Sequence, residues 1–271
     1  MERPGIVKQL LIEGEVADIF IEAPGGRRFV RIWGEFGSSA PIVLLHDSLG
    51  SVELWGDFPA SLMEATGRPV VAYDRLGFGK SDPYPGSLEP DFIREEARSS
   101  LPALGAQLKI GRMILFGHSV GGGMSVCAGA ALPDLIEAVI TESAQAFVEG
   151  RTVAGIRDAE KNFEEPGQIE RLARYHGDKA RWVLEAWTKT WLSPRFADWT
   201  LDDDLRRLCC PVLALHGDRD EYGSRLHPER IGGLASAGGE VVIFEDCGHV
   251  PHREFPELVL QAVTGFVAGR I

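Results

Sequence analysis

Short apolar runs alternate along most of the chain with longer stretches of helical periodicity. Near the start, residues 18–22 and 29–33 alternate apolar and polar positions with period two on either side of Gly25-Gly26, which predicts an antiparallel hairpin. Six later runs are continuously apolar, a pattern typical of strands that are covered on both faces of a sheet. They are residues 41–45, 69–73, 113–116, 136–141, 211–215 and 240–244.

Helical patterns separate these runs. They cover residues 57–66, 91–108, 119–131, 225–237 and 255–267. Strands that alternate with helices are joined by right-handed crossovers, which place helices on both faces of a parallel sheet. The sequence therefore predicts an α/β fold with a mostly parallel, eight-stranded sheet, in which the first two strands form the hairpin.

The segment from residue 147 to residue 208 interrupts this rhythm. It has no convincing strand, but it has helical patterns at residues 156–163, 168–175 and 179–191 and holds four of the six tryptophans. One interpretation is a helical subdomain whose aromatic rings pack its own core. The other is a cap that contributes rings to an apolar pocket, and the two can hold for different residues. We expect a core of residues 1–145 and 209–271 and a helical cap of residues 146–208.

Composition narrows the functional classes. The 271 residues are 44% hydrophobic, which excludes a disordered chain, and 28 Lys and Arg against 40 Asp and Glu give a net charge of −12. That balance argues against nucleic acid as the main partner, because phosphate binding depends on basic patches. The sequence has no secretory signal, no membrane-length apolar run and no cysteine pair spaced for a metal. We expect a cytoplasmic protein without a membrane span, and its oligomeric state is not predicted.

The strongest local motif is Gly117-His118-Ser119-Val120-Gly121-Gly122, between an apolar run and a helical pattern. Glycines on both sides of Ser119 allow a sharp strand-to-helix turn, which presents the hydroxyl at the carboxyl end of the sheet. The N–H of Val120, at the start of the helix, is placed to bind an oxyanion. This context predicts a nucleophilic serine.

A serine nucleophile needs a base, and seven histidines are available. His249 follows the last predicted strand and is therefore expected at the same sheet edge as the serine. His252 is the alternative base, and we expect it to be a rim or capping residue. His118 should point away from the serine and bond structurally, whereas His176 and His227 lie in polar stretches and are expected on the solvated surface.

The base needs an orienting carboxylate. Asp220 lies three residues beyond Gly217, after a predicted strand, where the loop should project it towards the base. Asp218 is the rival, although it could simply turn the loop through an Asx bond. Glu142, at the end of an adjacent strand, is a third candidate. The catalytic order would be serine, aspartate, histidine.

A second oxyanion donor could come from residues 46–51, which also leave the carboxyl end of a strand. The backbone N–H of Ser48 or Leu49 could point at the same site, or the segment could be a tight turn without a catalytic role. In the loop of residues 73–82, Asp74 and Arg75 are expected to make structural bonds.

Together these motifs resemble those of the α/β-hydrolases over nearly the whole chain. The matching segments are G-H-S-V-G-G, Y-D-R-L-G-F-G-K-S-D, H-G-D-R-D and C-G-H-V-P-H, in the order and at the spacings of that family. The resemblance implies Ser119 as nucleophile, Asp220 as acid and His249 as base, with an oxyanion hole formed by the N–H groups of Ser48 and Val120. The chain is most similar to single-cap enzymes such as 3-oxoadipate enol-lactonases, small carboxylesterases and cofactor-free C–C bond hydrolases.

Two positions depart from the family's pattern. Asp47 stands where a glycine is common, and its carboxylate either disfavours anionic substrates or points away from them. Ser224 stands where a proline is often found four residues after the acid, so the geometry of that loop is open.

The function expected from these residues is hydrolysis of a small carboxylic ester, thioester or lactone through an acyl-enzyme. No metal or organic cofactor is expected. The alternatives are a C–C bond hydrolase, lyase or perhydrolase on the same scaffold, or a ligand sensor without catalysis. The small-molecule substrate is expected in an apolar pocket, for which the candidate residues are Leu49, Phe147, Trp187, Trp191 and Val250.

Overall fold

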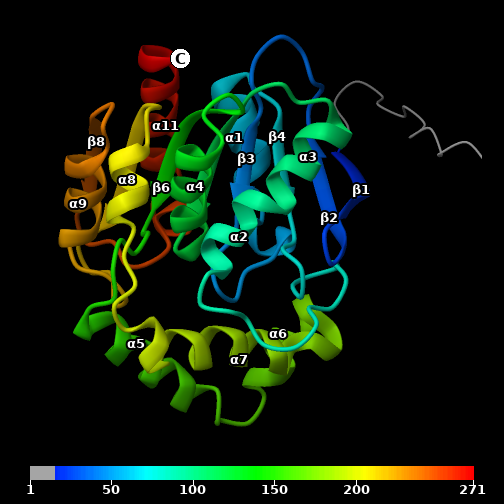
Figure 1. Cartoon of the computed structure of the whole chain (residues 1–271), viewed down its shortest axis with the longest axis vertical. Coiled ribbons are helices and arrows are strands. Elements are labelled where there is room, and N and C mark those ends of the chain that lie inside the picture. The colour runs from blue at the N-terminus through cyan, green and yellow to red at the C-terminus, as the bar shows by residue number, and fades with distance from the viewer. Residues whose placement is uncertain (1–15) are drawn as a thin grey trace, which may run out of the picture.

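A central sheet organises the protein, whose structure is a computed structural model that describes residues 16–271 (Figure 1). The strand order is β1-β2-β4-β3-β5-β6-β7-β8. The strands are β1 (Val16–Ala23), β2 (Gly26–Trp33), β3 (Ile42–Leu45), β4 (Val70–Tyr73), β5 (Met113–His118), β6 (Ile136–Glu142), β7 (Val212–Gly217) and β8 (Gly239–Phe244). β2 is antiparallel to both β1 and β4, and every other neighbouring pair is parallel. The predicted fold class is confirmed.

Helices cover both faces of this sheet. Those of the core are α1 (Phe58–Thr66), α2 (Phe92–Arg98), α3 (Ser100–Leu108), α4 (Val120–Ala131), α8 (Asp202–Arg207), α9 (Leu226–Leu234), α10 (Pro251–Glu254) and α11 (Pro256–Arg270). Strand periodicity sends alternate side chains to opposite faces. In β3, Ile42 and Leu44 pack on the face covered by α1 and α11, whereas Val43 and Leu45 pack on the face covered by α2, α3, α4, α8 and α9.

The helix expected over residues 91–108 is two helices, α2 and α3, which meet at Ser99. Pro102 explains the break, because a proline ring inside a helix clashes with the carbonyl four residues earlier, here that of Arg98. The Ser99 hydroxyl also donates to the carbonyl of Glu95 at 2.9 Å, which satisfies one acceptor at the end of α2.

Three helices stand apart from the sheet's two faces: α5 (Gly150–Asn162), α6 (Gln168–His176) and α7 (Ala180–Trp191) (Figure 1). The chain enters and leaves this α5–α7 insertion side by side. Phe147 forms an isolated antiparallel bridge with Thr200, and the Leu201 N–H donates to the Ala146 carbonyl at 2.8 Å. α8 packs against α4 and α9. The division of the chain into a core and a cap at residues 146–208 stays a prediction.

Two histidines expected on the surface are buried, so that prediction is wrong for His176 and His227. His176 connects the insertion to the core: its Nδ1 accepts the Gly79 N–H at 2.8 Å, and its Nε2 lies 2.9 Å from the Leu49 carbonyl. His227 accepts the Ala146 N–H at 3.1 Å. All three partners come from distant parts of the chain, whereas the polar neighbours of the two histidines in the sequence indicated only local solvation.

In residues 16–271, no helix combines the length and the apolar character that crossing a membrane requires.

The first turn of α4 generates a prediction for stability. A Cβ atom on Gly121 would lie 2.1 Å from the Leu45 carbonyl oxygen, whereas a Cβ on Gly123 would meet nothing closer than 3.6 Å. We expect Gly121→Ala to lower the free energy of unfolding by about 2–4 kcal/mol, because α4 must move away from β3. Gly123→Ala is the control in the same helix and should raise it by up to about 1 kcal/mol. Urea denaturation compares the two variants, and equal effects would contradict the close-approach explanation.

Candidate active site

A sharp turn between β5 and α4 presents Ser119. Its backbone has φ 55° and ψ −123°, a conformation that residues other than glycine rarely adopt. The turn is held in place by the Ser119 N–H, which donates to the Glu142 carbonyl at 2.8 Å. It also requires glycine at position 117, where a Cβ atom would lie 2.1 Å from the Gly121 carbonyl oxygen. The two glycines of the motif thus allow the strained serine between them.

His249 and Asp220 form a buried hydrogen-bonded pair in the loops that follow β8 and β7. The Nδ1 atom of His249 lies 2.8 Å and 2.9 Å from the two carboxylate oxygens of Asp220. Oδ1 of Asp220 also accepts the backbone N–H groups of Tyr222 at 2.7 Å and Gly223 at 3.1 Å. These bonds fix the carboxylate, so Nδ1 of His249 carries a proton and Nε2 is left as the basic nitrogen.

The pair shifts the pKa of both partners. Burial alone would lower the pKa of His249, but the charge and hydrogen bond of Asp220 outweigh it and raise this pKa. Burial alone would raise the pKa of Asp220, but the charge and hydrogen bond of His249 lower it. Both shifts stabilise an imidazolium beside a carboxylate, which is the charge state that a general base reaches during catalysis.

The rival carboxylates lie elsewhere. Asp218 is exposed, and Glu142 pairs with His252. The loop after Asp220 also explains the missing proline. The N–H and hydroxyl of Ser224 donate to the two carboxylate oxygens of Glu149 at 2.7 Å and 3.0 Å, and a proline could make neither bond.

The Ser119 hydroxyl has a partner that sequence reasoning missed. Its Oγ lies 3.4 Å from Oε1 of Gln145, whose side chain is buried and whose amide donates to the Ser143 carbonyl at 3.3 Å. The only available signal was position, because Gln145 follows the carboxyl end of β6. In this rotamer the hydroxyl faces Gln145, and it must rotate to donate to a base.

A cavity of about 220 Å³ lies next to Ser119 and His249, and we call it the serine cavity. The insertion contributes Thr152, Ile156, Trp187 and Trp191 to its wall, and the core contributes Asp47, Ser48, Leu49, Gln145, Glu221, Tyr222 and Val250. Four of the five candidate pocket residues therefore line it. The fifth, Phe147, packs instead against the ring of His227 with centroids 4.5 Å apart.

The two expected oxyanion donors come from different elements. Val120 is the first residue of α4, and Ser48 lies in the loop after β3 and lines the serine cavity. Within residues 16–271 neither backbone N–H donates a hydrogen bond to the protein. Both amides therefore stay candidate donors to an oxyanion.

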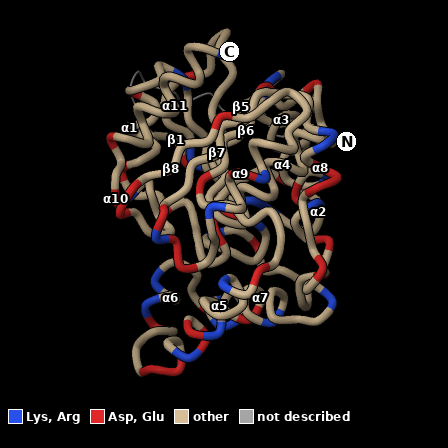
Figure 2. The backbone as a smooth tube through the Cα atoms, turned by 90° about the vertical axis from the view of Figure 1, so that its left-hand side faces the viewer, with Lys and Arg blue, Asp and Glu red and all other residues tan. Residues whose placement is uncertain are grey.

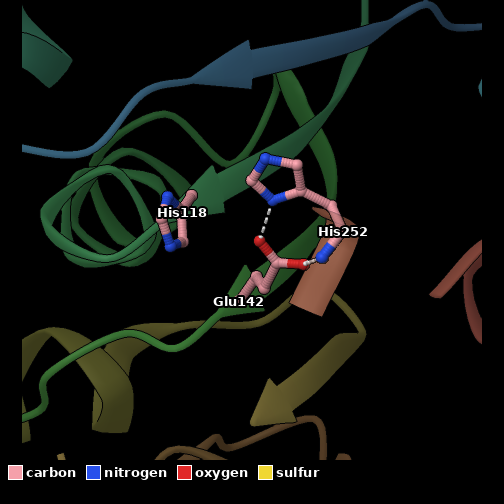
Figure 3. Close-up of side chains that lie close together, drawn as sticks. All are labelled: His118, Glu142 and His252. Atoms are coloured by element: carbon pink, nitrogen blue, oxygen red, sulfur yellow. Dashed lines mark hydrogen bonds and ion pairs between the residues drawn. The ribbon is translucent and has the colours of Figure 1, made fainter. Parts of the chain in front are cut away.

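A second buried pair joins Glu142 to His252 of α10 (Figure 3). The Nδ1 atom of His252 lies 2.6 Å from Oε2 of Glu142, and its backbone N–H donates to Oε1 at 2.8 Å. Burial alone would raise the pKa of Glu142, but the charge and hydrogen bonds of His252 lower it. The expectation that His252 lies at the rim is wrong, because its ring is buried against Trp55 and Phe58.

His118 connects this second pair to the first. Burial lowers the pKa of His118 to about 4, so its ring is neutral. Its Nε2 lies 2.8 Å from the His249 carbonyl oxygen and donates to it, a structural role that the sequence predicted. The residue before Ser119 thus holds the loop of His249, while Glu142 accepts bonds from both Ser119 and His252.

The cluster of His118, Glu142 and His252 has the composition of a metal site, since its donor atoms lie within 4.8 Å of one another. One ring nitrogen of each histidine and the Glu142 carboxylate are already engaged, however. Nδ1 of His252 bonds to Glu142, and Nε2 of His118 bonds to the His249 carbonyl. These hydrogen bonds account for the cluster as a structural network.

The sequence matches the alpha/beta hydrolase family over residues 42–262, and the chain belongs to this family. It is 36% identical over 104 residues to the sn-1-specific diacylglycerol lipase ABHD11 of Danio rerio, a match that covers 38% of this chain and 31% of that protein. It is 29% identical over 197 residues to the human serine hydrolase BPHL, covering 70% of this chain and 66% of that protein. The chain thus spans less than two thirds of either relative.

Solved structures agree in fold. The enol-lactonase from Burkholderia xenovorans superposes with a TM-score of 0.71 at 20% identity, covering 92% of this chain and all of that one (100%). The carboxylesterase CesB from Bacillus subtilis has a TM-score of 0.69 at 21% identity, covering 95% and 93%. The predicted resemblance to enol-lactonases and carboxylesterases is confirmed for the fold.

The buried Glu142–His252 pair generates a prediction for stability. We expect Glu142→Gln to lower the free energy of unfolding at neutral pH by about 2–4 kcal/mol, because it leaves His252 without its charged partner. Since the folded-state pKa of Glu142 lies below its usual 4.5, this contribution is present above that pH and is lost as pH falls through the folded value. The difference between the two proteins should therefore shrink in acid.

Glu137→Gln is the matched control for this experiment. Glu137 lies on the same strand, but its ion pair with Arg112, at 3.2 Å, is partly exposed. We expect Glu137→Gln to change the free energy of unfolding by less than about 1 kcal/mol. Chemical denaturation between pH 4 and 8 measures both variants, and an equal loss in both would argue against a special role for the buried pair.

Proposed function

We propose that this protein is a serine hydrolase that cleaves a small carboxylic ester, thioester or lactone. The observation that carries this proposal is the buried His249–Asp220 pair beside the strained Ser119 on one cavity. A weak nucleophile, an oriented base and a fixed carboxylate are the three parts that acyl transfer by serine needs.

In the proposed mechanism, Ser119 rotates from Gln145 and attacks the substrate carbonyl while Nε2 of His249 takes its proton. Asp220 stabilises the resulting imidazolium. The oxyanion receives hydrogen bonds from the N–H groups of Val120 and Ser48. His249 then protonates the leaving group, and in the second half it activates the water that releases the acid from Ser119.

We propose that the α5–α7 insertion acts as the cap of this site. It contributes two tryptophans to the serine cavity, and His176 fixes it to the Leu49 carbonyl in the candidate oxyanion loop. A cavity of about 220 Å³ with aromatic walls suits a small apolar or aromatic acyl group. The serine hydrolase and lipase activities named for the relatives support the same class of reaction. The same parts could serve C–C bond cleavage, and no observation favours it over ester hydrolysis.

Labelling with a fluorophosphonate tests the nucleophile without a choice of substrate. We expect one adduct, on Ser119, that is absent in Ser119→Ala and strongly reduced in His249→Ala. Turnover of any ester substrate should fall about 10⁴- to 10⁶-fold in Ser119→Ala. Ser125→Ala, in the same helix, is the control and should still be labelled. A folded wild-type protein that forms no adduct would favour the ligand-sensor alternative.

The raised pKa of His249 gives a prediction for pH dependence. The base must be neutral to accept a proton, so kcat/KM should rise with pH through an apparent pKa above the usual 6.5. Asp220→Asn removes the carboxylate that raises this pKa. It should move the rise to lower pH and reduce kcat by about 10⁴-fold. Asp218→Asn is the control, and its kcat should stay within about twofold of the wild-type value. A larger loss of kcat in Asp218→Asn than in Asp220→Asn would reverse the assignment of the acid.

A further inference from the structure

A second cavity, of about 420 Å³, lies between α6 and the loops of the core, and we call it the basic groove. Leu54 and Trp55 line its core side. Three arginines line it from two elements: Arg171 and Arg174 from α6, and Arg253 from α10. Figure 2 shows the basic positions of α6 as blue segments of the tube.

The cations of this groove are accessible to a ligand. All three arginines are exposed, and within residues 16–271 none of them forms an ion pair with a carboxylate. Arg253 donates to the Leu54 carbonyl, which holds it at the groove. Asp47 is the one carboxylate among the lining residues. A net positive groove in a chain of net charge −12 therefore marks a local preference for anions.

The basic groove and the serine cavity adjoin. Asp47, Leu49 and Val250 line both of them, and we call these three shared residues the neck. His118, which directly precedes Ser119, also lines the groove. A substrate that occupies both spaces would lie across the neck, with one end at Ser119 and the other at the arginines.

The geometry points to an anionic group, a phosphate or a carboxylate, on the leaving-group side of the ester that Ser119 cleaves, and this inference rests on the proposed function. Arginine recognises both groups through paired N–H donors. We assign the acyl group to the serine cavity, which the tryptophans wall, and the leaving group to the adjoining groove with its three arginines. Asp47 repels an anion from the neck, so the charge must lie several atoms beyond the scissile bond.

The test compares three esters that share one acyl group and differ in the leaving group, which is neutral, carboxylate-bearing or phosphate-bearing. The variant is Arg171→Gln with Arg174→Gln. The control is Arg181→Gln on α7, an exposed arginine that does not line the groove. We expect the ratio of kcat/KM for the anionic to the neutral ester to fall about 10- to 100-fold in the double variant and to stay unchanged in the control. It should also fall with added salt.

The anionic ester whose kcat/KM falls more in the double variant identifies phosphate or carboxylate as the preferred group. An unchanged ratio in the double variant, or an equal change in Arg181→Gln, overturns the inference. If the wild-type protein hydrolyses none of the three esters, the proposed function fails. Calorimetry with inorganic phosphate on the wild-type protein then tests whether the groove binds an anion. Binding that the double variant loses supports the anion site, and binding that is absent or unchanged overturns it.

Discussion

The close contact between the first turn of α4 and the ends of β3 and β5 is the constraint on which the rest of the site depends. Gly121 approaches the Leu45 carbonyl, and Gly117 approaches the Gly121 carbonyl, more closely than a Cβ atom would allow. Only this close approach lets the turn hold Ser119 in its strained backbone conformation. It also brings the start of α4 next to the loop that follows β3. The serine and both candidate oxyanion donors therefore depend on one contact between backbones.

Buried histidines then connect the loops around this turn. His249 with Asp220 and His252 with Glu142 each join loops from different strands, and His118 links the two pairs. Such pairs are expensive to bury, but a partner left alone is more costly still, so the loops are stable mainly in the arrangement that keeps both partners together. The network thus holds the loops around Ser119 and His249 in one arrangement.

Much of the fold could be predicted because it is encoded locally. Periodicity alone located the strands and most helices, and the Gly-rich turn located Ser119. The helix over residues 91–108 was wrong, although Pro102 was a visible signal for its break. His176 was misplaced and Gln145 was missed for a different reason. His176 is buried by partners far away in the chain, Leu49 and Gly79, and Gln145 meets Ser119 across the ends of two strands. No local pattern contains such pairings.

Asp47 places a carboxylate between two parts of the site that carry different charges. The net charge of −12 says nothing about a pocket, because the nearest groups dominate the local potential. Here the carboxylate stands at the neck, with acidic Glu221 on the serine-cavity side and Arg171 and Arg174 on the groove side. An anion is therefore favoured on the groove side of the neck, whereas a neutral carbonyl at Ser119 is not repelled. In the proposed reaction, the departure from the common glycine at this position would orient a charged substrate instead of excluding it.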